Sequence, residues 1–279
     1  MARWLTLLCL LCTSPALLAG TPTRIVSLTP HLTELLFAIG AGDRIVATDD
    51  ASDYPPEVKR LPQVANYRSI NLEALLAQKP DLIVAWRSAQ SRMLAPIEQL
   101  GIPVFYSEPT DFASLATEMR ALGKTLGVEK TANAEADAYL ARLAALSQRY
   151  GKPKHIKVFY QLWYPPLTSV SGNAWPAQAI ELCGGDNLMA DAPTPYPQVS
   201  LEQVIKANPA LILAGSQDAD ALHHWQQWQQ WQQWPMVDAV RHQRLQLINS
   251  DELHRFTPRA LNAVEQICRA IAGVQSPSF

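Results

Sequence analysis

The sequence predicts an α/β fold in which two lobes with largely parallel sheets are joined by a single long, rigid helix. Three observations indicate this fold. Apolar, strand-like runs alternate with amphipathic helical patterns in both halves of the 279-residue chain, as in parallel sheets. A helix–proline–strand pattern occurs once in each half. An alanine-rich stretch without Gly or Pro, residues 128–150, lies between the halves.

The first half, residues 21–126, begins with an apolar strand at residues 24–28 that is followed by a Thr-Pro turn. The helix expected over residues 31–40 has one apolar face, formed by Leu32, Leu35, Leu36 and Ile39. The same alternation predicts further strands at residues 44–48, 82–85 and 102–106, and helices after Asn71 and at residues 91–100 and 112–126.

The connecting helix is assigned to residues 127–150, because alanine is the best helix former. A helix of that length is a stiff connector. The second half, residues 151–279, then restarts the alternation. Its expected strands are residues 157–160, 211–214 and 244–248, and its expected helices are residues 175–183, one after Ser200, and a last one in which Thr257 is the cap and Pro258 the first residue.

The repeated pattern has the same parts in both halves: a cap residue, a glutamate two residues later, a proline seven residues after that, and an apolar strand. The caps are Asn71 and Ser200, the glutamates Glu73 and Glu202, and the prolines Pro80 and Pro209. Because the helix dipole favours an acidic residue in the first turn, the simplest interpretation of the two glutamates is that they stabilise helix starts.

The N-terminus has the pattern of a secretory signal peptide, with Arg3 before an apolar run and small residues after it. We expect residues 1–20 to be removed after Ala19 or Gly20 and the protein to be exported. The residue before Cys12 is not small, which disfavours the alternative of a lipid anchor. The net charge of −2 gives no sign of a nucleic-acid-binding surface.

Two of the four cysteines lie inside the predicted signal peptide, which leaves Cys183 and Cys268 in the exported protein. Both lie in helical patterns. An oxidising compartment favours one disulfide between them. Two buried free thiols are the alternative.

Trp86 and Trp163 follow predicted strands, where ligands of α/β sheets bind. Tyr67 and Tyr196 lie just upstream of the two copies of the repeated pattern. Together with two polar residues after the last strand they form the candidate ligand site: Tyr67, Trp86, Trp163, Tyr196, Asp251 and Arg255. Aromatic walls with a few polar groups suit a large, flat, partly apolar molecule. Ordinary core packing is the alternative for any one of these rings.

Four tryptophans recur at every third position, separated by Gln pairs: Trp225, Trp228, Trp231 and Trp234. At that spacing they spread over about half of a helix circumference. We expect structural packing, with Trp234 against the lobe, and leave a contact surface as the alternative.

Other function classes find little support. The six histidines show no metal-ligand spacing, so a zinc or manganese site is not expected. No catalytic motif of a hydrolase, metalloprotease or nucleotide-binding enzyme occurs, so we expect a protein that is not an enzyme and has no resident cofactor.

The chain resembles the periplasmic binding proteins that serve ABC importers of cobalamin, haem and ferric siderophores. The family-level motifs are RIVSLTP at residues 24–30, TELL at 33–36 and GAGDRIV at 40–46. A more specific set resembles the cobalamin-binding members: SDYPP at residues 52–56, NLE at 71–73, PDLIVAWR at 80–87, CGGDN at 183–187, PQVS at 197–200, and Asp251 with Arg255, Pro258 and Arg259.

The resemblance implies two Rossmann-like lobes bridged by one long helix, a periplasmic location and capture of cobalamin or another corrinoid in the cleft. It also implies that Glu73 and Glu202 dock onto the importer permease, that Trp86 contacts the corrin ring, and that Asp251 and Arg255 are polar cleft residues. The matched cysteines support the pairing of Cys183 with Cys268. We expect a monomer.

The sequence departs from the cobalamin-binding pattern at three positions. Ala51 stands where those members have an aromatic residue, and Tyr67 and Tyr196 stand where they have Trp. A haem or ferric-siderophore binder of the same fold is therefore the alternative, with Tyr67 as an axial ligand.

Overall fold

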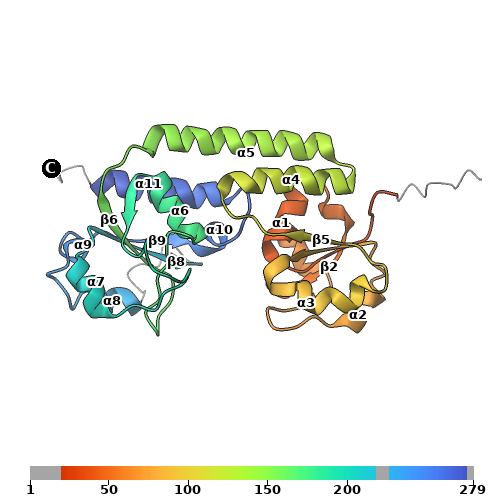
Figure 1. The fold of residues 1–279 in the computed structure, drawn as a ribbon, viewed down its shortest axis with the longest axis horizontal. Coiled ribbons are helices and arrows are strands. Elements are labelled where there is room, and N and C mark those ends of the chain that lie inside the picture. The colour runs from red at the N-terminus through yellow and green to blue at the C-terminus, as the bar shows by residue number, and fades with distance from the viewer. Residues whose placement is uncertain (1–19, 218–225, 275–279) are drawn as a thin grey trace, which may run out of the picture.

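The computed structural model describes residues 20–217 and 226–274. The predicted signal peptide, apart from Gly20, and Trp225 of the tryptophan repeat lie outside these residues. Two α/β lobes are connected by a long helix that spans the top of the molecule (Figure 1). The predicted fold class is confirmed: all strand pairs within the two sheets are parallel.

The N-terminal lobe contains a five-stranded sheet in the order β3-β2-β1-β4-β5. Its strands are β1 (Ile25–Ser27), β2 (Ile45–Asp49), β3 (Gln63–Ala65), β4 (Leu82–Trp86) and β5 (Val104–Ser107). Helices α1 (Pro30–Ala38) and α4 (Phe112–Leu126) pack on one face through one apolar cluster, and α2 (Leu72–Ala77) and α3 (Arg87–Glu98) pack on the other face through a second.

The C-terminal lobe contains a four-stranded sheet in the order β7-β6-β8-β9. Its strands are β6 (Ile156–Gln161), β7 (Gly185–Asn187), β8 (Leu211–Ser216) and β9 (Leu245–Asn249). Helices α6 (Trp175–Leu182) and α11 (Ala260–Val274) cover one face, and α7 (Leu201–Ala207), α8 (Gln226–Trp231) and α9 (Asp238–Arg241) lie on the other. The short helix α10 (Ser250–Leu253) follows β9 directly.

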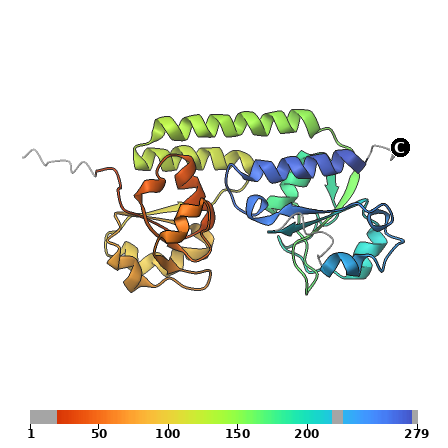
Figure 2. The ribbon, with the colours of Figure 1, turned by 180° about the vertical axis from the view of Figure 1, so that it is seen from behind.

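The connecting helix α5 (Glu129–Tyr150) lies beside α4 and α11 (Figures 1 and 2). Gly123 on α4 permits the close approach, because a Cβ atom there would stand 2.2 Å from Cβ of Ala132 on α5. One continuous apolar cluster runs from β1 and α1 through α4 and α5 to α6 and α11. The two lobes therefore share a core beneath α5.

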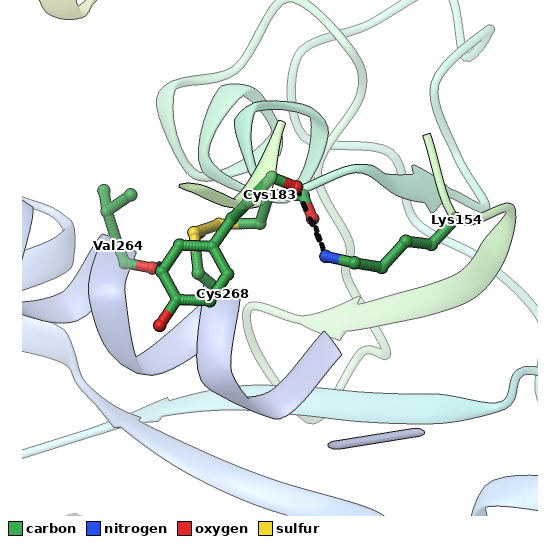
Figure 3. The surroundings of a disulfide bond; sticks show 5 residues. Lys154, Cys183, Val264 and Cys268 are labelled. Carbon is green, nitrogen blue, oxygen red and sulfur yellow. Dashed lines mark hydrogen bonds between the residues drawn. A yellow bond between two sulfur atoms is a disulfide. The ribbon is translucent and has the colours of Figure 1, made fainter. Parts of the chain in front are cut away.

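The predicted disulfide is confirmed: Cys183 at the end of α6 is bonded to Cys268 on α11 (Figure 3). Both residues are fully buried. Lys154 donates a hydrogen bond of 3.2 Å from Nζ to the carbonyl of Cys183, so the loop before β6 is tied to the same place.

The tryptophan repeat packs in the C-terminal lobe. Trp228 and Trp231 are buried against the α7–α8 face of the sheet, and Trp234 is partly buried beside them. Nε1 of Trp231 donates to Oε1 of Gln161 at 2.8 Å. Structural packing therefore accounts for Trp228, whereas Trp231 and Trp234 pack in the lobe and also line a cavity of about 390 Å³.

Several helix boundaries differ from the prediction, and the differences at α3 and α11 have a physical cause. Helix α3 begins at Arg87, four residues before the predicted start, because the side chain of Gln90 accepts a hydrogen bond from the Trp86 amide and satisfies the helix start. Helix α11 begins at Ala260. Thr257 does not cap it with its side chain, because residues 257–259 form a turn in which the amide of Ala260 donates to the carbonyl of Thr257.

Candidate ligand-binding cleft

Aromatic rings from both lobes meet where the two lobes face each other. Trp86, the last residue of β4, packs edge-on against His31 of α1 and against Phe256 of the C-terminal lobe, with ring centroids 4.9 and 5.0 Å apart. Phe256 also contacts Trp175 of α6 at 4.4 Å. Because these contacts join residues far apart in the sequence, they fix the position of Trp86 relative to the opposite lobe.

A cavity of about 250 Å³ lies at this junction. Its lining comes from the end of β4, the residue after β6, the start of α6 and the loops after α10 and before α7, and consists of Trp86, Leu162, Trp175, Pro176, Tyr196, His254 and Phe256. The lining is mostly aromatic, with a few polar edges. Such a surface suits a flat apolar ligand better than a charged one.

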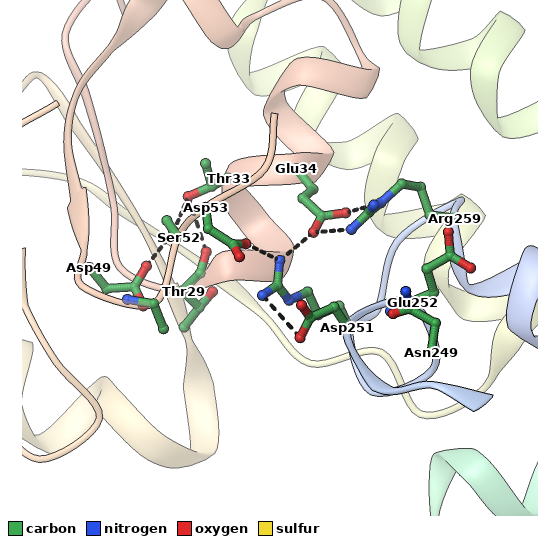
Figure 4. Close-up of polar contacts among 12 residues, drawn as sticks. Thr29, Thr33, Glu34, Asp49, Ser52, Asp53, Asn249, Asp251, Glu252 and Arg259 are labelled. Carbon is green, nitrogen blue, oxygen red and sulfur yellow. Dashed lines mark hydrogen bonds and ion pairs between the residues drawn. The ribbon is translucent and has the colours of Figure 1, made fainter. Parts of the chain in front are cut away.

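A cluster of charged side chains crosses between the lobes (Figure 4). It includes Arg255, whose sequence neighbours His254 and Phe256 line the cavity. Nη1 of Arg255 donates to Glu34 at 2.8 Å and to Asp53 at 2.7 Å, and Arg255 also pairs with Asp251 at 3.4 Å. Arg259 donates twice to the carboxylate of Glu34, both at 2.9 Å. We call Glu34, Asp53, Asp251, Arg255 and Arg259 the inter-lobe ion cluster.

The loop that carries Asp53 is held by a buried polar network. Ser52 donates to the carboxylate of Asp49 and contacts the hydroxyl of Thr33, which in turn donates to Ser27. Burial raises the pKa of Asp49, although the hydrogen bond from Ser52 opposes the shift. This network connects the end of β2 to α1 and so positions Asp53 opposite Arg255.

Electrostatics keep His31 and Arg255 in different charge states. Burial, assisted by the charge of Arg255, lowers the pKa of His31 to about 3, so its ring is neutral beneath Trp86. Burial alone would lower the pKa of Arg255, but its hydrogen bonds with Glu34 and Asp53 outweigh this effect and raise it. Arg255 is therefore a permanent cation whose main partners are carboxylates of the other lobe.

The six candidate ligand residues lie in three different places in the structure. Trp86 and Tyr196 line the same cavity. Tyr67 and Trp163 are not part of its lining, and their side chains are 82% and 65% exposed. Asp251 and Arg255 belong to the inter-lobe ion cluster.

Several residues of this junction were not among the candidate residues. Phe256, Trp175 and His254 line the cavity, and Glu34 and Asp53 hold Arg255. Phe256 and His254 flank Arg255 in the sequence, and this local proximity is a signal that predicts their place at the site. Glu34 has no such signal, because its partners are more than 200 residues away.

Glu73 and Glu202 are exposed in the first turns of α2 and α7. The predicted caps are confirmed: Asn71 accepts from the amide of Ala74 at 3.0 Å and Ser200 from the amide of Gln203 at 3.1 Å. Neither glutamate forms a salt bridge with any residue of the part that the structure describes. Both carboxylates are therefore available to a partner.

Within residues 20–217 and 226–274, no three or more His, Cys, Asp or Glu side chains are arranged to hold a metal ion. In the same residues, no helix combines the length and the apolarity needed to span a bilayer.

Comparison with known proteins adds sequence relatives. The family model described as periplasmic binding protein matches residues 25–252. A vitamin B12-binding protein of Vibrio cholerae is 37% identical over 258 residues, which cover 91% of this chain and 92% of the relative. A vitamin B12-binding protein of Yersinia pestis is 35% identical over 260 residues, which cover 93% of this chain and 90% of the relative.

Solved structures show the same fold. The crystal structure of the periplasmic vitamin B12-binding protein of Vibrio cholerae matches with a TM-score of 0.83 at 37% identity, covering 92% of this chain and 99% of that one. A periplasmic haem-binding protein of Vibrio cholerae matches with a TM-score of 0.77 at 22% identity, covering 89% of this chain and 98% of that one. The second similarity concerns the fold alone.

Proposed function

This chain belongs to the periplasmic binding protein family, and we propose that it captures cobalamin or a related corrinoid between its lobes and delivers it to an ABC importer. The observation that carries this proposal is the aromatic cavity at the inter-lobe junction, lined by Trp86, Tyr196 and Phe256. The identity to vitamin B12-binding proteins, which extends over both lobes, supports the same ligand class.

The ligand site is proposed to extend beyond the cavity. A volume of about 250 Å³ lies below the range of about 300–1,000 Å³ usual for pockets that hold drug-sized ligands, and a corrinoid is larger than these. The cavity can therefore receive only part of the macrocycle. Tyr67 and Trp163 are exposed and would contact the remainder, while Asp251 and Arg255 would face its polar side chains.

We propose that the importer permease docks through Glu73 and Glu202, one from each lobe. Two exposed carboxylates at equivalent places in two similar lobes suit a permease with two-fold symmetry and basic docking residues. The protein would act as a monomer made of residues 21–126, a connecting helix at 127–150 and residues 151–279.

The relatives are binding proteins, and we propose that this chain likewise acts by binding alone, with the corrinoid as transported ligand and no resident cofactor. Export to the periplasm would depend on residues 1–20 as the signal peptide.

Calorimetric titration of the purified mature protein tests the proposal. Cyanocobalamin or cobinamide should release or absorb heat with a stoichiometry near one. Trp86→Ala should weaken binding by about 1–3 kcal/mol if the ring contacts the ligand. Trp228→Ala is the matched control, because Trp228 is buried in the apolar cluster of the C-terminal lobe and does not line the cavity.

The haem alternative is tested by absorption spectroscopy during haem titration, together with the corrinoid calorimetry. If the protein binds haem with a Soret band that depends on Tyr67, and no corrinoid produces heat, the corrinoid proposal is wrong. Equal corrinoid affinity of the unmodified protein and the Trp86→Ala variant would remove Trp86 from the site and leave the ligand class intact.

A further inference from the structure

His254 lines the inter-lobe cavity, and one of its two ring nitrogens is hydrogen-bonded to a residue of the lobe interior. Its Nε2 lies 2.7 Å from the hydroxyl of Tyr160 on β6. Tyr160 is completely buried. This pair connects the cavity lining to the centre of the C-terminal sheet, and its proton arrangement decides what His254 presents to a ligand.

The hydroxyl of Tyr160 must be the donor of this hydrogen bond. Burial raises the pKa of Tyr160 far above the pH of the periplasm, so the hydroxyl keeps its proton. Among the residues that the structure describes, Nε2 of His254 is the hydroxyl's hydrogen-bond partner and no second acceptor is found. If Nε2 carried a proton, the hydroxyl proton would be buried without an acceptor, which is costly. Nε2 therefore accepts.

The remaining proton of the neutral ring then lies on Nδ1. Burial lowers the pKa of His254, although the carboxylate of Asp251 opposes this effect, so the imidazole is neutral and carries one N–H. Nδ1 has no hydrogen-bond partner in the described part of the chain, and it is not one of the sealed, unpaired polar atoms of the interior. Nδ1 is therefore not sealed in the interior, and it belongs to a side chain that lines the cavity.

We propose that the Nδ1–H of His254 is a hydrogen-bond donor for a neutral carbonyl acceptor of the bound ligand, in a tautomer that Tyr160 sets. The inference rests on the proposed function, since amide carbonyls surround a corrinoid ring. A single neutral donor in an aromatic cavity favours a ligand with a carbonyl at that place. A ligand N–H group would leave two donors opposed, and a cation would face the positive end of the N–H dipole. It also means that neither ring nitrogen offers a lone pair to a metal.

The tautomer is tested first, without any ligand. In a ¹⁵N-detected NMR spectrum of the unmodified protein, Nδ1 of His254 should show the shift of a protonated nitrogen and Nε2 that of an unprotonated one. Tyr160→Phe should abolish this preference, because the ring contact remains and the hydroxyl is lost. A protonated Nε2 in the unmodified protein would overturn the inference before any binding is measured.

The donor role is tested by affinity for cyanocobalamin. His254→Phe keeps a ring of similar size and removes the donor, and should weaken binding about three- to tenfold, as for the loss of one hydrogen bond. His254→Asn keeps an N–H at a comparable distance from the backbone and should restore most of the affinity. Thermal midpoints of both variants show whether each is folded.

The outcomes separate this inference from the proposed function. If the unmodified protein binds no corrinoid, the proposed function is wrong, and the tautomer result stands alone. If the unmodified protein binds a corrinoid and the His254→Phe variant binds it equally well, His254 is not a donor to the ligand. The same conclusion follows if the His254→Phe and His254→Asn variants weaken binding to the same extent. A change in the cobalt absorption spectrum that depends on His254 would also contradict the inference, because it would indicate coordination by a nitrogen lone pair.

Discussion

Trp86 lines the inter-lobe cavity and depends on its neighbours for its position there. Its amide is held by Gln90, and its ring lies against His31 and Phe256. His31 is almost completely buried and its Nε2 has no hydrogen-bond partner in the described residues. A charged imidazole in that place would face Arg255 without solvent. The support beneath Trp86 therefore requires a neutral His31.

This requirement predicts how stability depends on pH. Because folding depresses the pKa of His31 from 6.5 to about 3, the unfolded chain binds a proton below pH 6.5 that the folded protein excludes. Stability should therefore fall as the pH falls through that window, by about 2 kcal/mol from this residue between pH 7 and pH 5. Urea unfolding at the two pH values measures the loss.

His31→Phe keeps an aromatic ring and removes the titrating group. Between pH 7 and pH 5 this variant should therefore lose about 2 kcal/mol less stability than the unmodified protein. His155→Asn is the control, because His155 is exposed and its backbone φ of 54° suits Asn. Identical losses in the unmodified protein and the His31→Phe variant would mean that the fold does not keep His31 neutral.

Sequence alone could predict only part of the site at this scale. Trp86 and Tyr196 are accessible to prediction, because Trp86 follows a predicted strand and Tyr196 lies just upstream of the second copy of the repeated pattern. Both line the cavity. The pairing of Glu34 with Arg255 and Arg259 was not, because it joins residues that are 221 and 225 positions apart. Such contacts exist only after both lobes have folded and met.

At the scale of elements, helices α6 and α11 form a pair that the disulfide ties together. Cys183 ends α6 and Cys268 lies on the buried face of α11, with Cα atoms 4.7 Å apart. The bridge closes a segment with a sequence separation of 85 residues. Replacing both cysteines with Ala should lower stability by about 2–5 kcal/mol, because the unfolded chain gains freedom.

Thermal unfolding with and without a reductant tests this prediction. The reductant should lower the midpoint of the unmodified protein and leave the midpoint of the Cys183→Ala, Cys268→Ala variant unchanged. A midpoint that does not respond to the reductant in either protein would indicate that the bridge adds no stability.

The elements that sequence reasoning missed share a physical cause. Strands β3 and β7 have three residues each and lie at sheet edges, and α10 has four residues. β7 consists of Gly185, Asp186 and Asn187, which have low strand propensity. It pairs because β6 presents its backbone beside it. The helices α4 and α5 follow from composition, whereas these two short edge strands form only because a neighbouring strand is there to pair with them.

At the scale of the whole molecule, two features join the lobes: the shared core beneath α5 and the inter-lobe ion cluster. The Glu34 side chain is 3% exposed and pairs with both Arg255 and Arg259. Removing one partner of a buried pair leaves charge without compensation. Glu34→Gln should therefore lower stability by about 3 kcal/mol, the lower end of the range for buried pairs.

A surface pair provides the control for this prediction. Asp137→Asn breaks the ion pair with Arg120, in which the aspartate is 72% exposed, and should cost less than about 1 kcal/mol. Urea unfolding of both variants measures the difference. If the two changes cost the same, the lobes are held by the core beneath α5 and not by the ion cluster.

The two lobes place one exposed carboxylate each on a short, capped helix, and this duplication is what a symmetric partner could recognise. If Glu73 and Glu202 dock onto basic residues of the permease, the double change Glu73→Lys, Glu202→Lys should abolish corrinoid uptake in cells and leave corrinoid affinity in solution unchanged, since neither residue lines the cavity. Each single change should reduce uptake less. The control is Glu129→Lys, which reverses an exposed first-turn glutamate on α5. Loss of uptake in that control, or loss of affinity in the double variant, would mean that the two carboxylates do not act by docking.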